Sequence, residues 1–133
     1  MTYGTFDLLH VGHVNFLNRA KALGDQLVVG LSTDRFNREK KGRDPVYPYE
    51  HRRTILYSLR QVDAVVPEDS WEQKAEDMKK YGISVFAIGD DWEGKFDFLR
   101  DLGVEVVYLP RTPGVSTTDT RKKISEGGQG LGA

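Results

Sequence analysis

The sequence that decides the fold is GTFDLLHVGH, at residues 4–13. Only residues 1–3 precede it, so the first strand is expected to be unusually short, as if it had lost residues at its start. The segment 14–23 follows, with apolar residues at helical spacing and a stop at Gly24. A strand that passes through a glycine-containing turn into a helix is the first unit of an α/β fold. Ligands of such folds bind beyond the carboxyl ends of the strands, so residues 4–13 predict a ligand site at the first strand–helix junction.

The rest of the chain alternates short, β-branched apolar runs with helical segments. Buried strands are predicted for residues 26–31, 63–66, 85–88 and 104–109. Helices are predicted for residues 14–23, 51–62, 70–81, 96–102 and 117–124. Alternation at this spacing favours parallel strands joined by right-handed helical crossovers. We therefore expect an α/β fold, a Rossmann-like parallel sheet of about five strands with helices on both faces.

Length and local composition indicate how the chain is organised. A length of 133 residues suits one domain with one hydrophobic core, which we place at residues 1–126. Residues 127–133 are glycine-rich and are expected to form a flexible tail. Residues 37–49 are polar and are expected to form a long loop, and a loop of that length is either functional or floppy.

The charge and the missing residue types exclude several classes of protein. The 19 basic residues do not exceed the 20 acidic ones, so nothing draws the whole molecule to nucleic acid or to an anionic membrane. The absence of cysteine excludes a disulfide framework, a thiolate metal site and a cysteine nucleophile. No signal peptide and no membrane-spanning run is recognisable, so the protein is expected to be cytoplasmic and free of the membrane. Any anion site must be local.

Two histidines in the opening motif point to phosphate chemistry. His10 and His13 lie three residues apart, which puts both on one face of a helical turn. The amides and dipole of a helix N-terminus favour a phosphate there, and Gly12 removes a side chain where a phosphate must come close. Imidazolium groups at this place can donate to an α-phosphate while pyrophosphate departs. Histidines that merely cap or pack are the alternative, but a position at a strand–helix junction beside a glycine favours the phosphate site.

These residues resemble the signature of a known family. The pattern His-x-Gly-His after Gly-Thr-Phe-Asp is typical of the cytidylyltransferase-like nucleotidyltransferases, and a second family element is present as RTPGVSTT at residues 111–118. Pro113 stands where an acidic residue is often found. The resemblance implies a nucleotidyltransferase whose histidines contact the triphosphate. It also implies that Arg111, with the hydroxyls of Ser116 and Thr117, grips the β/γ end of that triphosphate.

The resemblance narrows to the glycerol phosphate branch of this family. It runs through STDRFN at residues 32–37, YEHR at 49–52, WEQK at 71–74 and GDDWEGKF at 89–96. It implies transfer of a cytidylyl group from CTP to sn-glycerol 3-phosphate, giving pyrophosphate and CDP-glycerol, a precursor of teichoic-acid-type polymers. Mg²⁺ is expected to accompany the CTP, as is usual in phosphoryl chemistry, and a homodimer is implied.

The resemblance also implies roles for individual residues. The catalytic residues are expected to be His10, His13, Lys40 and Arg111. The acceptor phosphate is expected to bind at Lys40, Lys74, Trp71 and Trp92. The nucleotide is expected to bind at Thr5, Phe6, His10, Val11, Gly12, His13, Lys41, Asp90, Asp91, Arg111, Thr112, Pro113, Gly114, Val115, Ser116, Thr117 and Thr118. No residue is assigned firmly to a metal ion.

Several of these assignments leave alternatives open. Either Lys40 or its neighbour Lys41 reaches the phosphates. Asp90 and Asp91 are either metal ligands or lie beside the cytosine. We prefer the second, because separating cytosine from uracil needs a fixed acceptor for the exocyclic amine. Asp7 serves either a structural hydrogen bond or a metal ion.

The function also has rivals. A tryptophan most often packs and a lysine is most often solvated, so Trp71, Trp92 and Lys74 owe their roles to the resemblance alone. The same chemistry on another phosphomonoester is the nearest rival, with phosphoethanolamine, a sugar phosphate, FMN or phosphopantetheine as the acceptor. A nucleotide-binding module without catalysis is the rival from a different class.

Overall fold

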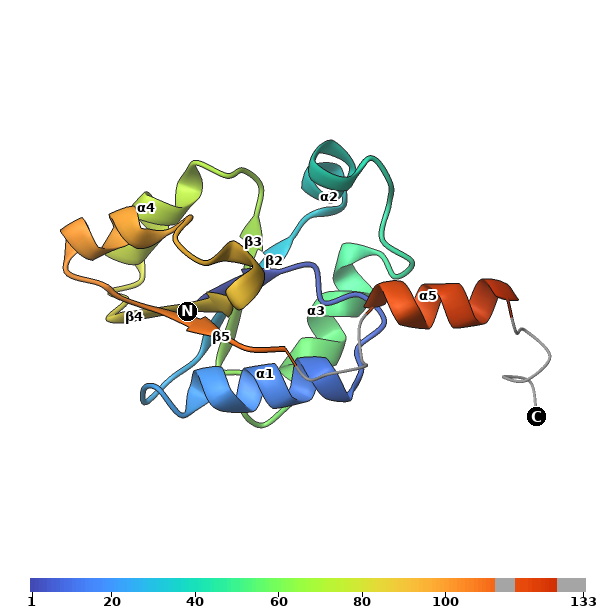
Figure 1. The fold of residues 1–133 in the computed structure, drawn as a ribbon, viewed down its shortest axis with the longest axis horizontal. Helices are drawn as coiled ribbons and strands as arrows, with labels where there is room; N and C mark the ends of the chain where they lie inside the picture. Colours follow the sequence, from blue (N-terminus) through green and yellow to red (C-terminus); the bar gives the residue numbers. More distant parts are fainter. Residues whose placement is uncertain (112–116, 127–133) are drawn as a thin grey trace.

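The computed structural model describes residues 1–111 and 117–126, which form an α/β fold with parallel strands (Figure 1). The strands in this part of the chain are β1 (Thr2–Gly4), β2 (Val28–Ser32), β3 (Ala64–Glu68), β4 (Val85–Gly89) and β5 (Glu105–Leu109). β2 lies between β1 and β3 in one sheet, and β4 pairs with β5 in a second sheet. All of these pairings are parallel. The prediction of an unusually short first strand is confirmed, since β1 has three residues.

The strands do not form the single sheet of about five strands that the sequence predicts. They divide into a three-stranded sheet and a two-stranded sheet. The two sheets adjoin where the amide of Ala87 donates to the carbonyl of Met1 at 2.9 Å. The amino group of Met1 also donates to the carbonyl of Val85 at 2.8 Å. β1 thus lies between β2 and β4, but its three residues are too few to carry a full ladder along both edges.

Helices follow most of the strands. They are α1 (Val11–Lys21), α2 (Asp34–Lys41), α3 (Tyr49–Tyr57), α4 (Gln73–Lys80) and α5 (Thr117–Glu126), with two 3₁₀ helices, η1 (Asp90–Trp92) and η2 (Asp97–Leu102). Several predicted boundaries shift by a few residues, and the segment predicted as a helix at 96–102 is 3₁₀. The helix predicted to open at Ser70 begins at Gln73, whose side chain accepts from the amides of Asp69 and Ser70.

The prediction that residues 37–49 form one long loop is wrong, because α2 occupies its first part. The side chain of Thr33 caps the helix by accepting from the amide of Phe36 at 3.2 Å. Gly42 ends the helix in the left-handed conformation, with φ at 74°. These local caps outweigh the polar composition that suggested a loop, and they place Lys40 and Lys41 on the last turn of a helix.

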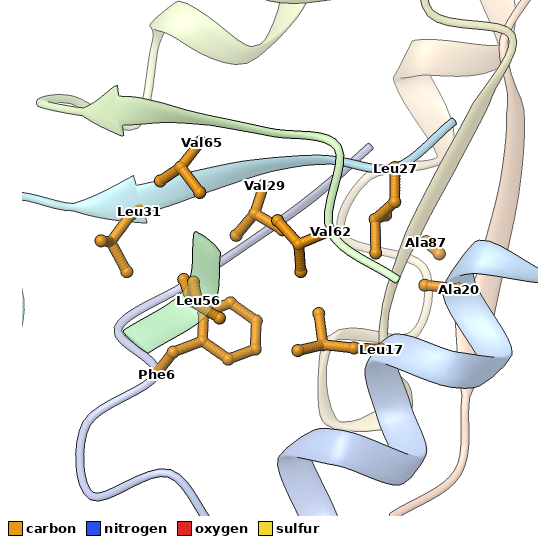
Figure 2. Close-up of a cluster of buried hydrophobic side chains, with 10 residues drawn as sticks. All are labelled: Phe6, Leu17, Ala20, Leu27, Val29, Leu31, Leu56, Val62, Val65 and Ala87. Atoms are coloured by element: carbon orange, nitrogen blue, oxygen red, sulfur yellow. The ribbon is translucent and has the colours of Figure 1, made fainter. Parts of the chain in front are cut away.

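Two clusters of buried side chains lie on opposite faces of the strands. The first packs α1 and α3 against one face (Figure 2) and contains Phe6, Leu17, Ala20, Leu27, Val29, Leu31, Leu56, Val62, Val65 and Ala87. The second packs α4 and η2 against the other face and contains Met1, Tyr3, Met78, Phe86, Ile88, Phe96, Leu99, Val104 and Val106. Consecutive residues of β4 alternate between the two clusters, as the two-residue period of a strand requires. Helices therefore cover both faces, as predicted.

The expectation of a flexible tail at 127–133 falls on residues outside the described part of the chain, as do residues 112–116. Within 1–111 and 117–126, no helix has the length and apolar character needed to cross a membrane.

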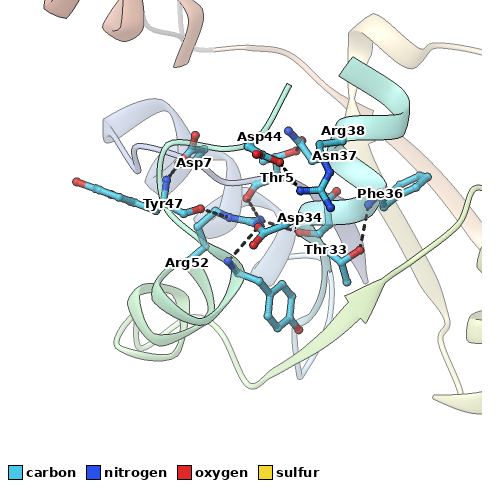
Figure 3. A network of polar contacts seen from close by, with 12 residues as sticks. Thr5, Asp7, Thr33, Asp34, Phe36, Asn37, Arg38, Asp44, Tyr47 and Arg52 are labelled. Atoms are coloured by element: carbon cyan, nitrogen blue, oxygen red, sulfur yellow. Dashed lines mark hydrogen bonds and ion pairs between the residues drawn. The ribbon is translucent and has the colours of Figure 1, made fainter. Parts of the chain in front are cut away.

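Arg52 of α3 joins the ends of two strands to the loop before α3 (Figure 3). Its side chain is fully buried. Nη1 donates to the carbonyls of Thr5 at 2.9 Å and Ser32 at 2.8 Å, directly after β1 and at the end of β2. Nε donates to the carbonyl of Tyr47 at 2.8 Å, and Nη2 pairs with the carboxylate of Asp34 at 2.7 Å. One guanidinium thus satisfies main-chain acceptors that the sheet leaves over at its carboxyl edge.

Replacing Arg52 by Met tests this role. The substitution keeps a long apolar side chain but leaves the partly exposed carboxylate of Asp34 and three main-chain carbonyls without their donor. We expect the free energy of unfolding to fall by about 3–5 kcal/mol, because three main-chain carbonyls lose their donor. Urea denaturation followed by circular dichroism measures the change. Arg53→Met, at the neighbouring and more exposed position, is the control and should stay within about 1 kcal/mol of the parent. Equal losses for the two variants would contradict the role.

Candidate active site

The chain turns sharply between β1 and α1. Phe6 and Leu8 both adopt the left-handed conformation, with φ at 47° and 50°. Residues other than glycine are strained there by about 1 kcal/mol or more, and such strain gathers at functional sites. A side chain on Gly4 would lie 2.8 Å from the ring of Phe6, so the glycine lets that ring fold back against β1. The turn therefore puts the residues after β1 at the carboxyl edge of the sheet.

Asp7 holds this turn in place. Its Oδ1 accepts from the amides of Leu8 at 3.1 Å and Tyr47 at 3.0 Å. Its Oδ2 accepts from the amide of Val46 at 2.6 Å and from Arg121 of α5 at 2.6 Å. The carboxylate is buried, and both oxygens are taken by donors. These contacts favour the structural role for Asp7 over the metal role.

His10 and His13 cap α1 with each other's help. The Nδ1 of His10 accepts from the amide of Gly12 at 3.0 Å, and the Nδ1 of His13 accepts from the amide of His10 at 3.1 Å. The rings stack with their centroids 3.9 Å apart. A helix amide that could have faced a phosphate is therefore engaged by the cap. The Nε2 of His10 is buried and has no hydrogen-bond partner among the described residues.

The charge state of the histidines differs from the sequence expectation. Burial, followed by the neighbouring His10, lowers the pKa of His13 to about 4, and burial also lowers the pKa of His10. Near neutral pH these shifts favour neutral rings over imidazolium. Because each Nδ1 accepts a hydrogen bond, the single proton of each neutral ring lies on Nε2. The helix amides are thus occupied by Nδ1, and the Nε2–H groups of the rings are the donors at this helix N-terminus.

Two cavities adjoin at the carboxyl edge of the strands. One, of about 240 Å³, contains Lys40 and Lys74 in its wall, and we call it the lysine cavity. The other, of about 250 Å³, contains His13, and we call it the histidine cavity. They share part of their lining, namely Tyr3, Gly4, Thr5, Lys41, Ile88 and Trp92. A molecule in one cavity would therefore touch a molecule in the other at Lys41 and the end of β1.

Lys74 is the most enclosed cation of the lysine cavity. Its side chain is 2% exposed, and Nζ lies 2.7 Å from a carboxylate oxygen of Glu68. Nζ also lies over three aromatic rings, at 4.7 Å from the centroid of Tyr3, 4.9 Å from Trp71 and 5.5 Å from Phe96. Such rings attract a cation through their faces. The plain expectation of a solvated helix lysine is wrong for this residue.

Lys40 approaches the same cavity from α2. Its Nζ donates to the hydroxyl of Ser32 at 2.7 Å and lies 5.0 Å from the ring centroid of Phe36. Burial lowers the pKa of Lys40 to about 8, although the charge of Glu68 opposes that shift. Lys41 lines both cavities, and burial lowers its pKa as well. The two lysines thus divide the sites between them, with Lys40 on the lysine cavity and Lys41 at the junction.

Charged and aromatic groups complete the two walls. Trp71 and Trp92 lie with their ring centroids 5.6 Å apart, and both line the lysine cavity. Asp91 lines the histidine cavity and forms an ion pair with the exposed Arg111. Asp90 begins η1 beside it but does not line either cavity.

The remaining nucleotide assignments are placed unevenly. Thr5 and Phe6 line the histidine cavity, whereas Val11 is exposed and lines neither cavity. Five assignments lie outside the described residues, namely Thr112, Pro113, Gly114, Val115 and Ser116. For Thr117 and Thr118 only the helical backbone of α5 is described.

Sequence reasoning missed several residues that hold the site together. Glu68 ends β3 as a carboxylate directly after a buried strand, a position that could have been flagged. Asn37 is buried, accepts from the hydroxyl of Thr5 at 2.8 Å and donates to the carbonyl of Arg43. Arg52 lies four residues before Leu56 on the buried face of α3, and an arginine on an apolar face is the signal that was available.

The sequence of the chain matches a known protein family. The Cytidylyltransferase-like family matches residues 1–123, and the protein belongs to that family.

Particular relatives are more specific. The chain is 58% identical to the glycerol-3-phosphate cytidylyltransferase of Bacillus subtilis (strain 168), over 94% of this chain and 95% of that relative. It is 51% identical to the glycerol-3-phosphate cytidylyltransferase of Staphylococcus aureus, over 93% and 92% of the two chains. It is also 40% identical to an FAD synthase of Pyrococcus abyssi, over 92% and 89% of the two chains.

A solved structure has a similar fold. A lipopolysaccharide core biosynthesis protein from Thermoplasma volcanium aligns with a TM-score of 0.71 at 27% identity. The alignment covers 84% of this chain and 95% of that one.

The neutral state of His13 can be measured by nitrogen-15 NMR of the imidazoles. We expect the Nε2–H tautomer to persist across about pH 6–8 and the ring to protonate with a midpoint near 4. Because the folded pKa is depressed, the stability that this group contributes should be lost as the pH falls from about 6.5 towards 4. The His13→Asn variant assigns the resonances. A midpoint near 6.5 would contradict the buried, neutral ring.

Proposed function

We propose that the protein transfers a cytidylyl group from CTP to sn-glycerol 3-phosphate and releases CDP-glycerol and pyrophosphate. The observation that carries the proposal is the pair of adjoining cavities, one lined by His13 and one lined by the buried Lys74 and the half-buried Lys40. The triphosphate would bind in the histidine cavity and the acceptor phosphate in the lysine cavity. The two relatives above 50% identity carry the name of this activity and support the choice of acceptor.

The chemistry needs little from the protein beyond position and charge. A phosphate oxygen of the acceptor forms a bond to the α-phosphorus while the bond from that phosphorus to the β-phosphate oxygen breaks. The attacking oxygen is already anionic near neutral pH, so no strong general base is required. His10 and His13 would donate from Nε2 to the α- and β-phosphates as charge moves onto the departing pyrophosphate. Lys41, which lines both cavities, would neutralise charge where the two substrates meet.

The lysine cavity suits a small, doubly charged acceptor. Its volume of about 240 Å³ is low for a binding pocket, which favours glycerol 3-phosphate over FMN as the acceptor. Lys40 and Lys74 would bind the phosphate, and Trp71 and Trp92 would border the glycerol. In an acceptor such as phosphoethanolamine the ammonium group would be disfavoured beside these lysines, which would weaken its binding relative to glycerol 3-phosphate.

We propose that residues of η1 recognise the cytosine base. We assign Asp91 to the exocyclic amine of cytosine and Arg111 to the β/γ end of the triphosphate. In the structure these two side chains form an ion pair with each other. Each of them therefore has a partner until the nucleotide supplies an amine for one and phosphate oxygens for the other.

Mg²⁺ is proposed to accompany the CTP. The described residues contain no group of three His, Cys, Asp or Glu side chains that could hold a metal ion. Both oxygens of Asp7 already accept hydrogen bonds. The residues present thus fit an ion coordinated mainly by phosphate oxygens and water, as Mg²⁺ prefers, and it would neutralise charge on the pyrophosphate. A homodimer and a cytoplasmic location complete the proposal.

A comparison of nucleotides and acceptors tests the proposed function. Pyrophosphate release is measured with CTP or ATP, each combined with glycerol 3-phosphate, phosphoethanolamine, a sugar phosphate and FMN. We expect kcat/KM for CTP with glycerol 3-phosphate to exceed every other pair by about tenfold or more, since the cavities discriminate by charge and size. A preference for ATP with FMN would overturn the proposal. Nucleotide binding without turnover in the presence of magnesium would favour a non-catalytic module.

Lys74→Met tests the assignment of the lysine cavity. Methionine keeps the stem among the three rings but removes the ammonium group. We expect KM for glycerol 3-phosphate to rise about tenfold or more and KM for CTP to stay within about twofold. Lys79→Met, at an exposed position of the same helix, is the control. Equal increases in both KM values would remove Lys74 from the acceptor site.

A further inference from the structure

A carboxylate lies in the wall of the cavity that we assign to a phosphate. Glu68 is the last residue of β3 and is 2% exposed, and it lines the lysine cavity. A negative charge at this place repels a phosphate and is expensive to bury without partners. Its presence therefore needs a reason beyond packing, because a neutral residue of the same size would spare both costs.

The two oxygens of Glu68 serve different lysines. Oε2 lies 2.7 Å from the Nζ of Lys74. Oε1 accepts from the hydroxyl of Ser32 at 2.7 Å, and that hydroxyl in turn accepts from the Nζ of Lys40 at 2.7 Å. Oε1 also lies 3.7 Å from the Nζ of Lys40. One carboxylate thus links a lysine of α2 and a lysine of α4, on either side of the cavity.

The charges around Lys40 make this link necessary. The groups that face Lys40 are Lys41 on α2, Arg52 on α3, Lys74 on α4 and Glu68 on β3. The first three are cations and lower the pKa of Lys40, as its burial does; Glu68 alone in this set raises it. Without the carboxylate, Lys40 would lose its proton closer to neutral pH. The lining as a whole carries three lysines and one carboxylate, which leaves two positive charges for a doubly charged phosphate.

Resting on the proposed function, we infer that Glu68 is a positioning residue for the acceptor. It holds Lys40, through Ser32, and Lys74 in the orientation that receives the phosphate of a small phosphomonoester. Glu68 does not contact the reacting atoms in this role. Its effect reaches the acceptor through the two ammonium groups, so it should act on acceptor binding and leave CTP binding alone.

The charge-removing variant Glu68→Gln tests the inference. The amide keeps the size of the side chain but removes the negative charge. We expect KM for glycerol 3-phosphate to rise about tenfold near pH 7 while KM for CTP stays within about twofold. We also expect the acceptor KM of the variant to begin rising at lower pH than in the parent, where the rise should begin near pH 8, the pKa of Lys40. Glu76→Gln, at an exposed position on α4, is the matched control.

A second variant guards against a loss of folding. Glu68→Asp keeps the charge but shortens the reach to both lysines. We expect it to keep the pH dependence of the parent and to raise the acceptor KM only about threefold. Circular dichroism establishes that each variant is folded, and if Glu68→Gln does not fold, the Glu68→Asp variant decides alone. A purely structural carboxylate would not separate the two KM values and would not move the pH dependence of the acceptor KM.

Failure of this inference is distinct from failure of the proposed function. A parent protein that does not turn over CTP with glycerol 3-phosphate overturns the proposed function. A parent that does, together with a folded Glu68→Gln variant whose acceptor KM and pH dependence match those of Glu76→Gln, overturns the inference alone. A Glu68→Asp variant that raises both KM values equally also overturns it.

Discussion

The buried guanidinium of Arg52 joins the chain after β1, the end of β2 and the loop before α3, and it pairs with Asp34 at the start of α2. Main-chain carbonyls at the ends of strands that no neighbouring strand pairs need other donors. A single planar group with donors on three nitrogens can meet several of them at once. The consequence is positional: the turn with the histidines and the helix with Lys40 and Lys41 are held at the same edge.

A second constraint is the balance of charge inside a site built for anions. Three buried or half-buried cations near the cavities each pair with a carboxylate of the protein. Arg121 has Asp7, Arg52 has Asp34, and Lys74 has Glu68. Cations that are paired in this way stay charged and ordered in the absence of a ligand, because an unpaired charge in a buried place is strongly disfavoured. Under the proposed function, this arrangement precedes phosphate binding and lowers the free-energy cost of binding the phosphate.

The two histidines of the cap stabilise the fold with one ring nitrogen and leave the other ring nitrogen for chemistry. His10 and His13 use Nδ1 to satisfy helix amides, and this use leaves the proton of each neutral ring on Nε2. A helix N-terminus normally offers its amides directly to a phosphate. Here the imidazoles extend that donor character, with rings whose lowered pKa values favour the neutral form. A bound triphosphate would raise their pKa, since an adjacent negative charge favours the charged form.

Local pattern alone predicted the alternation of strands and helices, the short first strand, helices on both faces, and a site after β1 with two histidines. These features depend on residues close in sequence, such as the spacing of His10 and His13 or the run of apolar residues in β2. The caps of α2 were also local, at Thr33 and Gly42, and were overlooked among polar residues. The division into two sheets, the neutral histidines and the burial and partners of Arg52 and Glu68 were decided by tertiary structure. Burial and partnership of a charge depend on residues far apart, as the separation of 114 positions between Asp7 and Arg121 illustrates, and no local pattern encodes which of them meet.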